Sequence, residues 1–314
     1  MKAVNRMKRA GDNELRTTDG IIIVDKESGP SSFKVVEGIK KLLKVRKAGH
    51  AGTLDPFANG ILLVLLNQGT KLSPFLMSQD KVYRATLRLG IETDTQDLTG
   101  TVIKEKRVGE LTTEEIKEAA LQYIGTITQV PPHYSAVHHK GKRAYELARN
   151  GVAFAPQERE VRIDYITILS VGLPAVWIEV GCSSGTYIRT LAADLGRSLG
   201  TGAHLTFLRR IKCGPFHVDN SSTVPQIVQH LSKDTVEELI LPLKGALEGM
   251  VEVEVPDSLA RKIRNGYQPQ KGDLSWDNFC PNNSGSYFKA VKGKELVAIL
   301  KGSNSRYEIG RVFT

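Results

Sequence analysis

A segment rich in glycine, residues 49–60, combines a carboxylate with an imidazole and reads Gly-His-Ala-Gly-Thr-Leu-Asp-Pro-Phe-Ala-Asn-Gly. A carboxylate on such a loop, held between two buried elements, could act as a nucleophile or a general base. Asp55 is therefore the first candidate for chemistry. An aspartate before a proline is also an ordinary turn signal, and on composition alone a turn residue is the commoner case. His50 has the same two interpretations.

Other kinds of reactive site find no support in the sequence. It has no Walker loop, no HExxH zinc motif and no serine nucleophile elbow. Gly200 and Gly202 begin like a dinucleotide fingerprint, but its third glycine is missing. His138 and His139 are adjacent, so a regular helix or strand cannot turn both toward one metal. We therefore expect neither a metal nor a cofactor.

Buried elements must hold the 49–60 loop on both sides. An apolar run at 20–25 predicts a strand, and Ser31 or Ser32 is a suitable N-cap for a helix running to about Val45. The loop is followed by a second apolar strand at 61–66. Residues 82–89 then alternate between apolar and polar, which predicts a strand whose apolar face includes Tyr83. Without further information Tyr83 is simply a core residue.

The rest of the chain predicts more strands than helices. Residues 94–100 resemble a hairpin connection, Thr112 and Glu115 form a capping box, and 126–158 is expected to be irregular with a short helix near 145–150. The other expected elements are helices at 112–123, 187–199 and 258–265, and strands at 161–169, 175–182, 205–211, 296–300 and 307–312. Strands and helices do not alternate regularly, so we predict an α+β fold with a mixed, largely antiparallel sheet.

The length and the changes in composition suggest two folded units. A chain of 314 residues is long for one domain and comfortable for two. We expect a basic, flexible tail at 1–18, a catalytic domain at 19–250 and a small β-rich module at 251–314.

The charge points toward a polyanionic partner. The chain carries a net charge of +9, and basic residues gather at 40–47, directly before the candidate loop. A second basic group consists of Arg209, Arg210 and Lys212. Three cysteines without a CxxC pair fit a reducing compartment, and no apolar run is long enough to cross a membrane. We therefore expect a cytoplasmic protein that does not bind membranes.

Six ordered motifs give the candidate loop a sharper meaning. The segment 49–62 resembles the catalytic loop of the bacterial tRNA pseudouridine-55 synthases, the TruB family. The resemblance extends in order over about residues 20–220. The matching segments are 24–32, 49–62, 80–84 (Asp-Lys-Val-Tyr-Arg), 129–146, 184–190 (Ser-Gly-Thr-Tyr-Ile-Arg-Thr) and 202–210. Six matches in the same order are very improbable by chance.

The resemblance implies a fold, a reaction and specific roles. It implies a pseudouridine synthase domain that flips a uridine out of the T-stem and loop of tRNA (position 55) and isomerises it without a cofactor. Asp55 takes the place of the nucleophile, Arg189 that of the arginine paired with it, and Tyr83 that of the tyrosine stacked on the uracil. The remaining matched positions contact the substrate or support the site: His50, Tyr187, Leu208 and Lys26. Residues 126–158 would contact the RNA, and residues 251–314 resemble a PUA-type RNA-binding domain.

Two alternatives remain open at this point. One is a guide-dependent enzyme like the catalytic subunit of the box H/ACA particle, which works with protein partners. Residues 129–146 look bacterial, however, and favour an enzyme that acts alone as a monomer. The other is an RNA-folding protein in which isomerisation is secondary. The sequence also departs from the family at His138 and His139, where a lysine-containing stretch is more usual, and at Ala51, where threonine is commoner.

Overall fold

The computed structural model describes residues 18–132, 138–139, 142–143, 157–270, 272–274, 286–302 and 307–314. The predicted tail, except for its last residue, lies outside these residues. Most of the predicted 126–158 insertion lies outside them as well, including the short helix expected near 145–150. All helices and strands named for this protein lie within the described residues.

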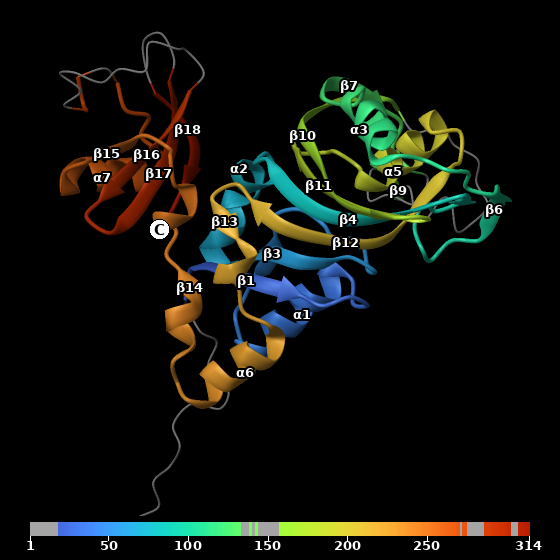
Figure 1. The fold of residues 1–314 in the computed structure, drawn as a ribbon. Helices are drawn as coiled ribbons and strands as arrows, with labels where there is room; N and C mark the ends of the chain where they lie inside the picture. The colour runs from blue at the N-terminus through green and yellow to red at the C-terminus, as the bar shows by residue number, and fades with distance from the viewer. Residues whose placement is uncertain are drawn as a thin grey trace, which may run out of the picture.

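A ten-stranded mixed sheet forms the centre of the molecule (Figure 1). Its strands run in the order β14-β1-β3-β12-β4-β11-β10-β7, with β2 beside β3 and β13 beside β12. They are β1 (Gly20–Lys26), β2 (Ala48–His50), β3 (Asn59–Leu66), β4 (Lys81–Leu89), β7 (Gly125–Gln129), β10 (Arg159–Gly172), β11 (Ala175–Cys182), β12 (Ala203–Cys213), β13 (Phe216–His217) and β14 (Ile240–Leu241). Within this sheet only β3 and β12 are paired in parallel. The predicted α+β fold with a mixed, largely antiparallel sheet is confirmed.

Four helices cover one face of the sheet, in two groups at different places along it (Figure 1). Helices α3 (Thr113–Leu121) and α5 (Ile188–Ser198) pack on β4, β10, β11 and β12, and α1 (Ser32–Leu42) and α6 (Val224–Ser232) pack on β1 and β3. The capping box at Thr112 is present. Helix α1 ends three residues before the predicted Val45, because Lys44 adopts a left-handed φ of 49° that a helix cannot accommodate.

Two smaller pairs of strands complete the domain. Strands β5 (Ile91–Thr93) and β6 (Val102–Glu105) flank the predicted hairpin connection, and β8 (His138–His139) pairs with β9 (Lys142–Arg143). The prediction of irregular structure from residue 126 onward was wrong for the first four residues. They belong to β7, because their backbone pairs with β10, more than thirty residues later in the sequence.

A small β-rich module follows, as predicted. It consists of β15 (Glu252–Glu254), β16 (Tyr287–Lys292), β17 (Glu295–Gly302), β18 (Tyr307–Val312) and α7 (Asp257–Arg264). The module packs beside α2 (Ser73–Met77) and the short helix η1 (Asn67–Leu72), where the Phe75 and Tyr287 rings meet edge to face at 5.1 Å. The other short helices are η2 (Val218–Asn220), η3 (Val236–Leu239) and η4 (Gly245–Leu247).

Candidate active site

Asp55 lies on the loop between β2 and β3, at the wall of a cavity of about 290 Å³. The cavity is bounded by this loop, by the start of β4, by the turn that leads into α5, and by β12. Five of the residues selected from the sequence line it together: Asp55, Tyr83, Tyr187, Arg189 and Leu208. The fold therefore gathers segments that are far apart in the chain.

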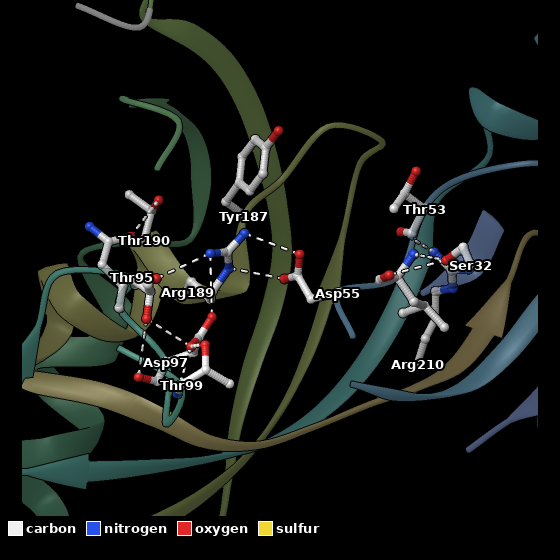
Figure 2. Close-up of polar contacts among 12 residues, drawn as sticks. Ser32, Thr53, Asp55, Thr95, Asp97, Thr99, Tyr187, Arg189, Thr190 and Arg210 are labelled. Carbon is white, nitrogen blue, oxygen red and sulfur yellow. Dashed lines mark hydrogen bonds and ion pairs between the residues drawn. The ribbon is translucent and has the colours of Figure 1, made fainter. Parts of the chain in front are cut away.

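Arg189 grips the Asp55 carboxylate with two nitrogens (Figure 2). Its Nε lies 2.9 Å from one carboxylate oxygen and its Nη2 lies 3.1 Å from the other. The Nη2 contact is a hydrogen bond and the Nε contact a close ion pair, so together they fix the orientation of the carboxylate as well as its charge. The Arg189 side chain is 4% exposed and that of Asp55 is 31% exposed, so the carboxylate can still be reached from the cavity.

A second carboxylate, Asp97, supports Arg189 from behind (Figure 2). The Arg189 Nη1 donates to the backbone oxygen of Thr95 at 3.1 Å and lies 3.4 Å from Asp97 Oδ2. Asp97 is itself held by Thr95 and Thr99, whose hydroxyls donate to its Oδ1 at 2.8 and 2.5 Å. Asp97 was not among the residues predicted from the sequence, because an aspartate among threonines in a hairpin connection is typical of a turn.

The environment of Asp55 has opposing effects on its ionisation. Burial raises the pKa of the Asp55 carboxyl, and the neighbouring negative charge of Asp97 adds to this rise. The charges of Arg189 and Lys26 lower the pKa and so favour the carboxylate. The guanidinium is thus the main group that keeps the buried acid available as an anion.

The catalytic loop is held from below by side chains of β1 and α1. The Lys26 ammonium donates to the backbone oxygens of Pro56 and Ala58, which follow Asp55 in the loop, at 3.2 and 2.7 Å. The Ser32 hydroxyl donates to the oxygen of Leu54 at 3.0 Å and accepts from its N–H at 2.8 Å. Lys26 thus lies behind the loop and is not among the residues that line the described cavity.

Two aromatic residues face the cavity from different elements, Tyr83 from β4 and Tyr187 from the start of α5. Burial raises the pKa of Tyr83 to about 12, so its hydroxyl keeps its proton at neutral pH. Tyr187 is the N-cap residue of α5, and its backbone N–H and oxygen bind the side chain of Gln129 on β7 at 3.0 and 3.3 Å. The guanidinium of Arg159 lies over the Tyr187 ring, 5.0 Å from its centroid.

His50 stands apart from this group. It ends β2, pairs with Val64 of β3 and is half-buried, but it is not among the residues that line the described cavity. Its position five residues before Asp55 keeps it near the loop.

The structure changes the interpretation of the second basic group. Arg209 is engaged by Asp25, with its Nη2 2.7 Å from the carboxylate, and Arg210 is 1% exposed. These two residues therefore do not form an exposed basic patch with Lys212 as expected, because only Lys212 of the three is exposed. The run at 40–47 differs: its lysines and Arg46 are all exposed.

Within the described part of the chain, no cluster of three or more His, Cys, Asp or Glu side chains could hold a metal ion. None of the described helices is long and apolar enough to cross a membrane.

Comparison with known proteins agrees with this site. Residues 40–188 match the model of the TruB family pseudouridylate synthase N-terminal domain, and 189–248 match the tRNA pseudouridylate synthase B C-terminal domain. The chain is 44% identical to tRNA pseudouridine synthase B of Syntrophus aciditrophicus (strain SB) over 82% of each chain. It is 42% identical to that of Syntrophobacter fumaroxidans (strain DSM 10017 / MPOB), over 88% of this chain and 89% of that one.

A solved structure extends the similarity to the whole fold. The fold resembles that in the crystal structure of a Cbf5-Nop10-Gar1 complex, with a TM-score of 0.75 and 27% identity. The match covers 94% of this chain and 85% of the other. Residues 1–250 make up less than 94% of this chain, so the match must extend beyond residue 250. It therefore includes part of the C-terminal module. Together these findings confirm the resemblance inferred from the six motifs: the chain belongs to the TruB family of pseudouridylate synthases.

Proposed function

We propose that the chain isomerises a uridine in the T-stem and loop of tRNA to pseudouridine, with Asp55 as the nucleophile. The observation that carries this proposal is the Asp55 carboxylate, held by two nitrogens of Arg189 and open to a cavity that also contains Tyr83. An enzyme of this family is an isomerase, because the same atoms are present in substrate and product.

The reaction requires three changes, and the site offers a group for each. The glycosidic bond must break, the uracil must turn, and C5 must bond to ribose C1′, which releases the C5 hydrogen as a proton. Asp55 attacks C6 of the base or C1′ of the sugar. Tyr83 provides a flat surface for the detached uracil, and its protonated hydroxyl is placed to relay a proton.

The uridine must first leave the stacked RNA loop, which costs on the order of a few kcal/mol. The exposed cations at 40–47 can offset this through contacts with phosphates. We assign tRNA binding to this surface, to residues 126–158 and to the PUA-like module at 251–314. We further propose that His50, Tyr187, Leu208 and Lys26 bind or support the flipped nucleotide. The enzyme is proposed to work in the cytoplasm as a monomer without a cofactor.

Tritium release from a tRNA transcript that carries [5-³H]uridine tests the proposal directly. Wild type should release tritium to water, and Asp55→Asn should not, although both should bind the RNA. Release by both proteins would show that Asp55 is not the nucleophile. Binding without release by wild type would contradict the proposed reaction.

The similarity to Cbf5 supports a second candidate, an enzyme that depends on a guide RNA and protein partners. A bare tRNA transcript separates the two. Turnover by the purified chain alone supports the stand-alone enzyme, whereas turnover only after addition of a guide and partners supports the second candidate.

A further inference from the structure

Arg210 is a buried cation that the proposed reaction does not use. Its side chain is 1% exposed and is the largest of the fully buried side chains in the described structure. A guanidinium in such a place must find acceptors for its N–H groups. No carboxylate pairs with Arg210 among the residues that the structure describes. Backbone oxygens take that place.

These oxygens belong to both ends of the catalytic loop. Arg210 Nη2 donates to Gly52 at 3.1 Å and Nη1 donates to Thr53 at 3.4 Å, just before Asp55. Its Nε donates to Ile61 at 2.9 Å, after the loop has entered β3. One planar group therefore sets the distance between the two ends of the loop. Arg210 is itself among the residues that line the cavity.

The backbone around Arg210 leaves the loop little freedom. Arg210 lies opposite Gly60 in the parallel β3–β12 pair. A Cβ at position 60 would lie 2.2 Å from the Arg210 backbone oxygen, and the φ of Gly60 is +100°. Only glycine allows this approach.

Arg210 also reaches the other side of the cavity. It lies directly opposite Tyr83 in the antiparallel β4–β12 pair. The positive charge of Arg210 lowers the pKa of the Tyr83 hydroxyl, against the larger rise that burial causes. The guanidinium thus binds the loop that carries Asp55, while Arg210 and Tyr83 lie opposite each other on paired strands and line the same cavity.

We propose that Arg210 is a positioning residue that holds the Asp55 loop and the Tyr83 hydroxyl at a fixed separation, and so aligns the nucleophile with the uracil. This inference rests on the proposed function. It assigns Arg210 a role in the chemical step and none in the contact with RNA phosphates.

The test compares Arg210→Lys with Arg209→Lys under single-turnover conditions, with the full chain in excess over tritiated tRNA transcript. Lysine keeps the charge but lacks the fork that spans three carbonyls. Arg209, one residue earlier, pairs with Asp25 and with the Asn59 side chain but donates to none of the loop's backbone oxygens, which makes it a matched control. We expect Arg210→Lys to lower the rate constant by about 10²-fold, the loss typical of a misplaced reactive group, with an unchanged Kd for tRNA. Arg209→Lys should retain the wild-type rate constant.

A double-mutant cycle with Tyr83→Phe gives a readout that a purely structural role would not move. The effects of Arg210→Lys and Tyr83→Phe should be non-additive, because both disturb the same alignment. All rates are measured at a temperature at which every variant is folded.

Three results would overturn the inference: a folded Arg210→Lys with the wild-type rate constant, a raised Kd with an unchanged rate at saturation, or strictly additive effects. Failure of both Arg210→Lys and Arg210→Gln to fold would also overturn it and assign the residue to stability. An inactive wild type, by contrast, would contradict the proposed function itself.

Discussion

The two sides of the cavity use buried cations in different ways. On one side Arg189 meets carboxylates, Asp55 in front and Asp97 behind. On the other side Lys26 and Arg210 meet backbone oxygens of the catalytic loop. Both arrangements satisfy charged groups that water cannot easily reach. They differ in what they control.

The carboxylate side controls the ionisation of Asp55, the proposed nucleophile, because Arg189 opposes the effect of burial on its pKa. The carbonyl side controls the shape of the loop, because its cations fix backbone atoms on both sides of Asp55. Substitutions on the first side should therefore affect chemistry with little effect on folding. Substitutions on the second side should affect both.

Removing the nucleophile should have the largest effect. Asp55→Asn keeps the size of the side chain, and we expect a loss of about 10⁴-fold or more in the single-turnover rate constant. Burial raises the pKa of Asp55, which means that the ionised carboxylate disfavours the folded state at neutral pH. The melting temperature of Asp55→Asn at pH 7 should therefore be no lower than that of wild type. A large fall in melting temperature would contradict the proposed difference between the carboxylate side and the carbonyl side.

Asp97→Asn tests whether the rear carboxylate matters for chemistry. It removes the charge behind Arg189 but keeps an oxygen for Thr95 and Thr99, and we expect a loss of about 10²-fold in rate with normal tRNA binding. Asp94→Asn is the matched control. Asp94 lies in the same hairpin and accepts from the Thr101 N–H, outside the Arg189 network. Equal losses in the two variants would mean that only the hairpin is needed.

The role of Lys26 on the carbonyl side can be tested through the pH dependence of stability and activity. Burial lowers its pKa from 10.5 to about 8, so the folded protein releases a proton that the unfolded chain still holds between these values. The free energy of unfolding should accordingly rise with pH from about 8 to 10.5, and this rise should be absent in Lys26→Met.

Activity should fall over the same pH range, since a neutral Lys26 amine holds the loop carbonyls less well. We expect Lys26→Met to be about tenfold slower at pH 7, because two charge-assisted hydrogen bonds to the loop are lost. Chemical denaturation and single-turnover rates at several pH values provide the measurement. An identical pH dependence of stability in the two proteins would contradict this assignment.

The smallest effect is expected far from the cavity. Tyr287→Ala removes the edge-to-face contact with Phe75, a contact of the kind worth about 0.5–1.5 kcal/mol. We expect a lower melting temperature and an unchanged single-turnover rate constant. A slower reaction would show that the C-terminal module also shapes the cavity wall through α2.

The sequence predicted the parts of this site that are local or repeated across a family. The apolar runs at 20–25 and 61–66 and the capping box at Thr112 depend on near neighbours, and the structure has them close to where they were expected. The motifs placed Asp55, Tyr83 and Arg189 in one site. Asp97 and Arg210 were missed or misread, because their partners lie 92 and about 150 residues away and their own neighbourhoods look like a turn and a basic patch. Burial, which decides whether an arginine binds phosphate or backbone, is not visible in a run of basic residues.

The order in which these parts leave the ribosome has a consequence of its own. Asp55 and Arg189 are separated by 134 positions. The Arg210 guanidinium donates to Gly52, which is synthesised 158 positions earlier. The parallel pairing of β3 with β12 likewise waits for the end of the catalytic domain. A nascent chain that stops before β12 already contains Asp55, the proposed nucleophile, but lacks part of the cavity wall. The chain therefore cannot catalyse the reaction during most of its own synthesis, although its basic segment at 40–47 has already been made.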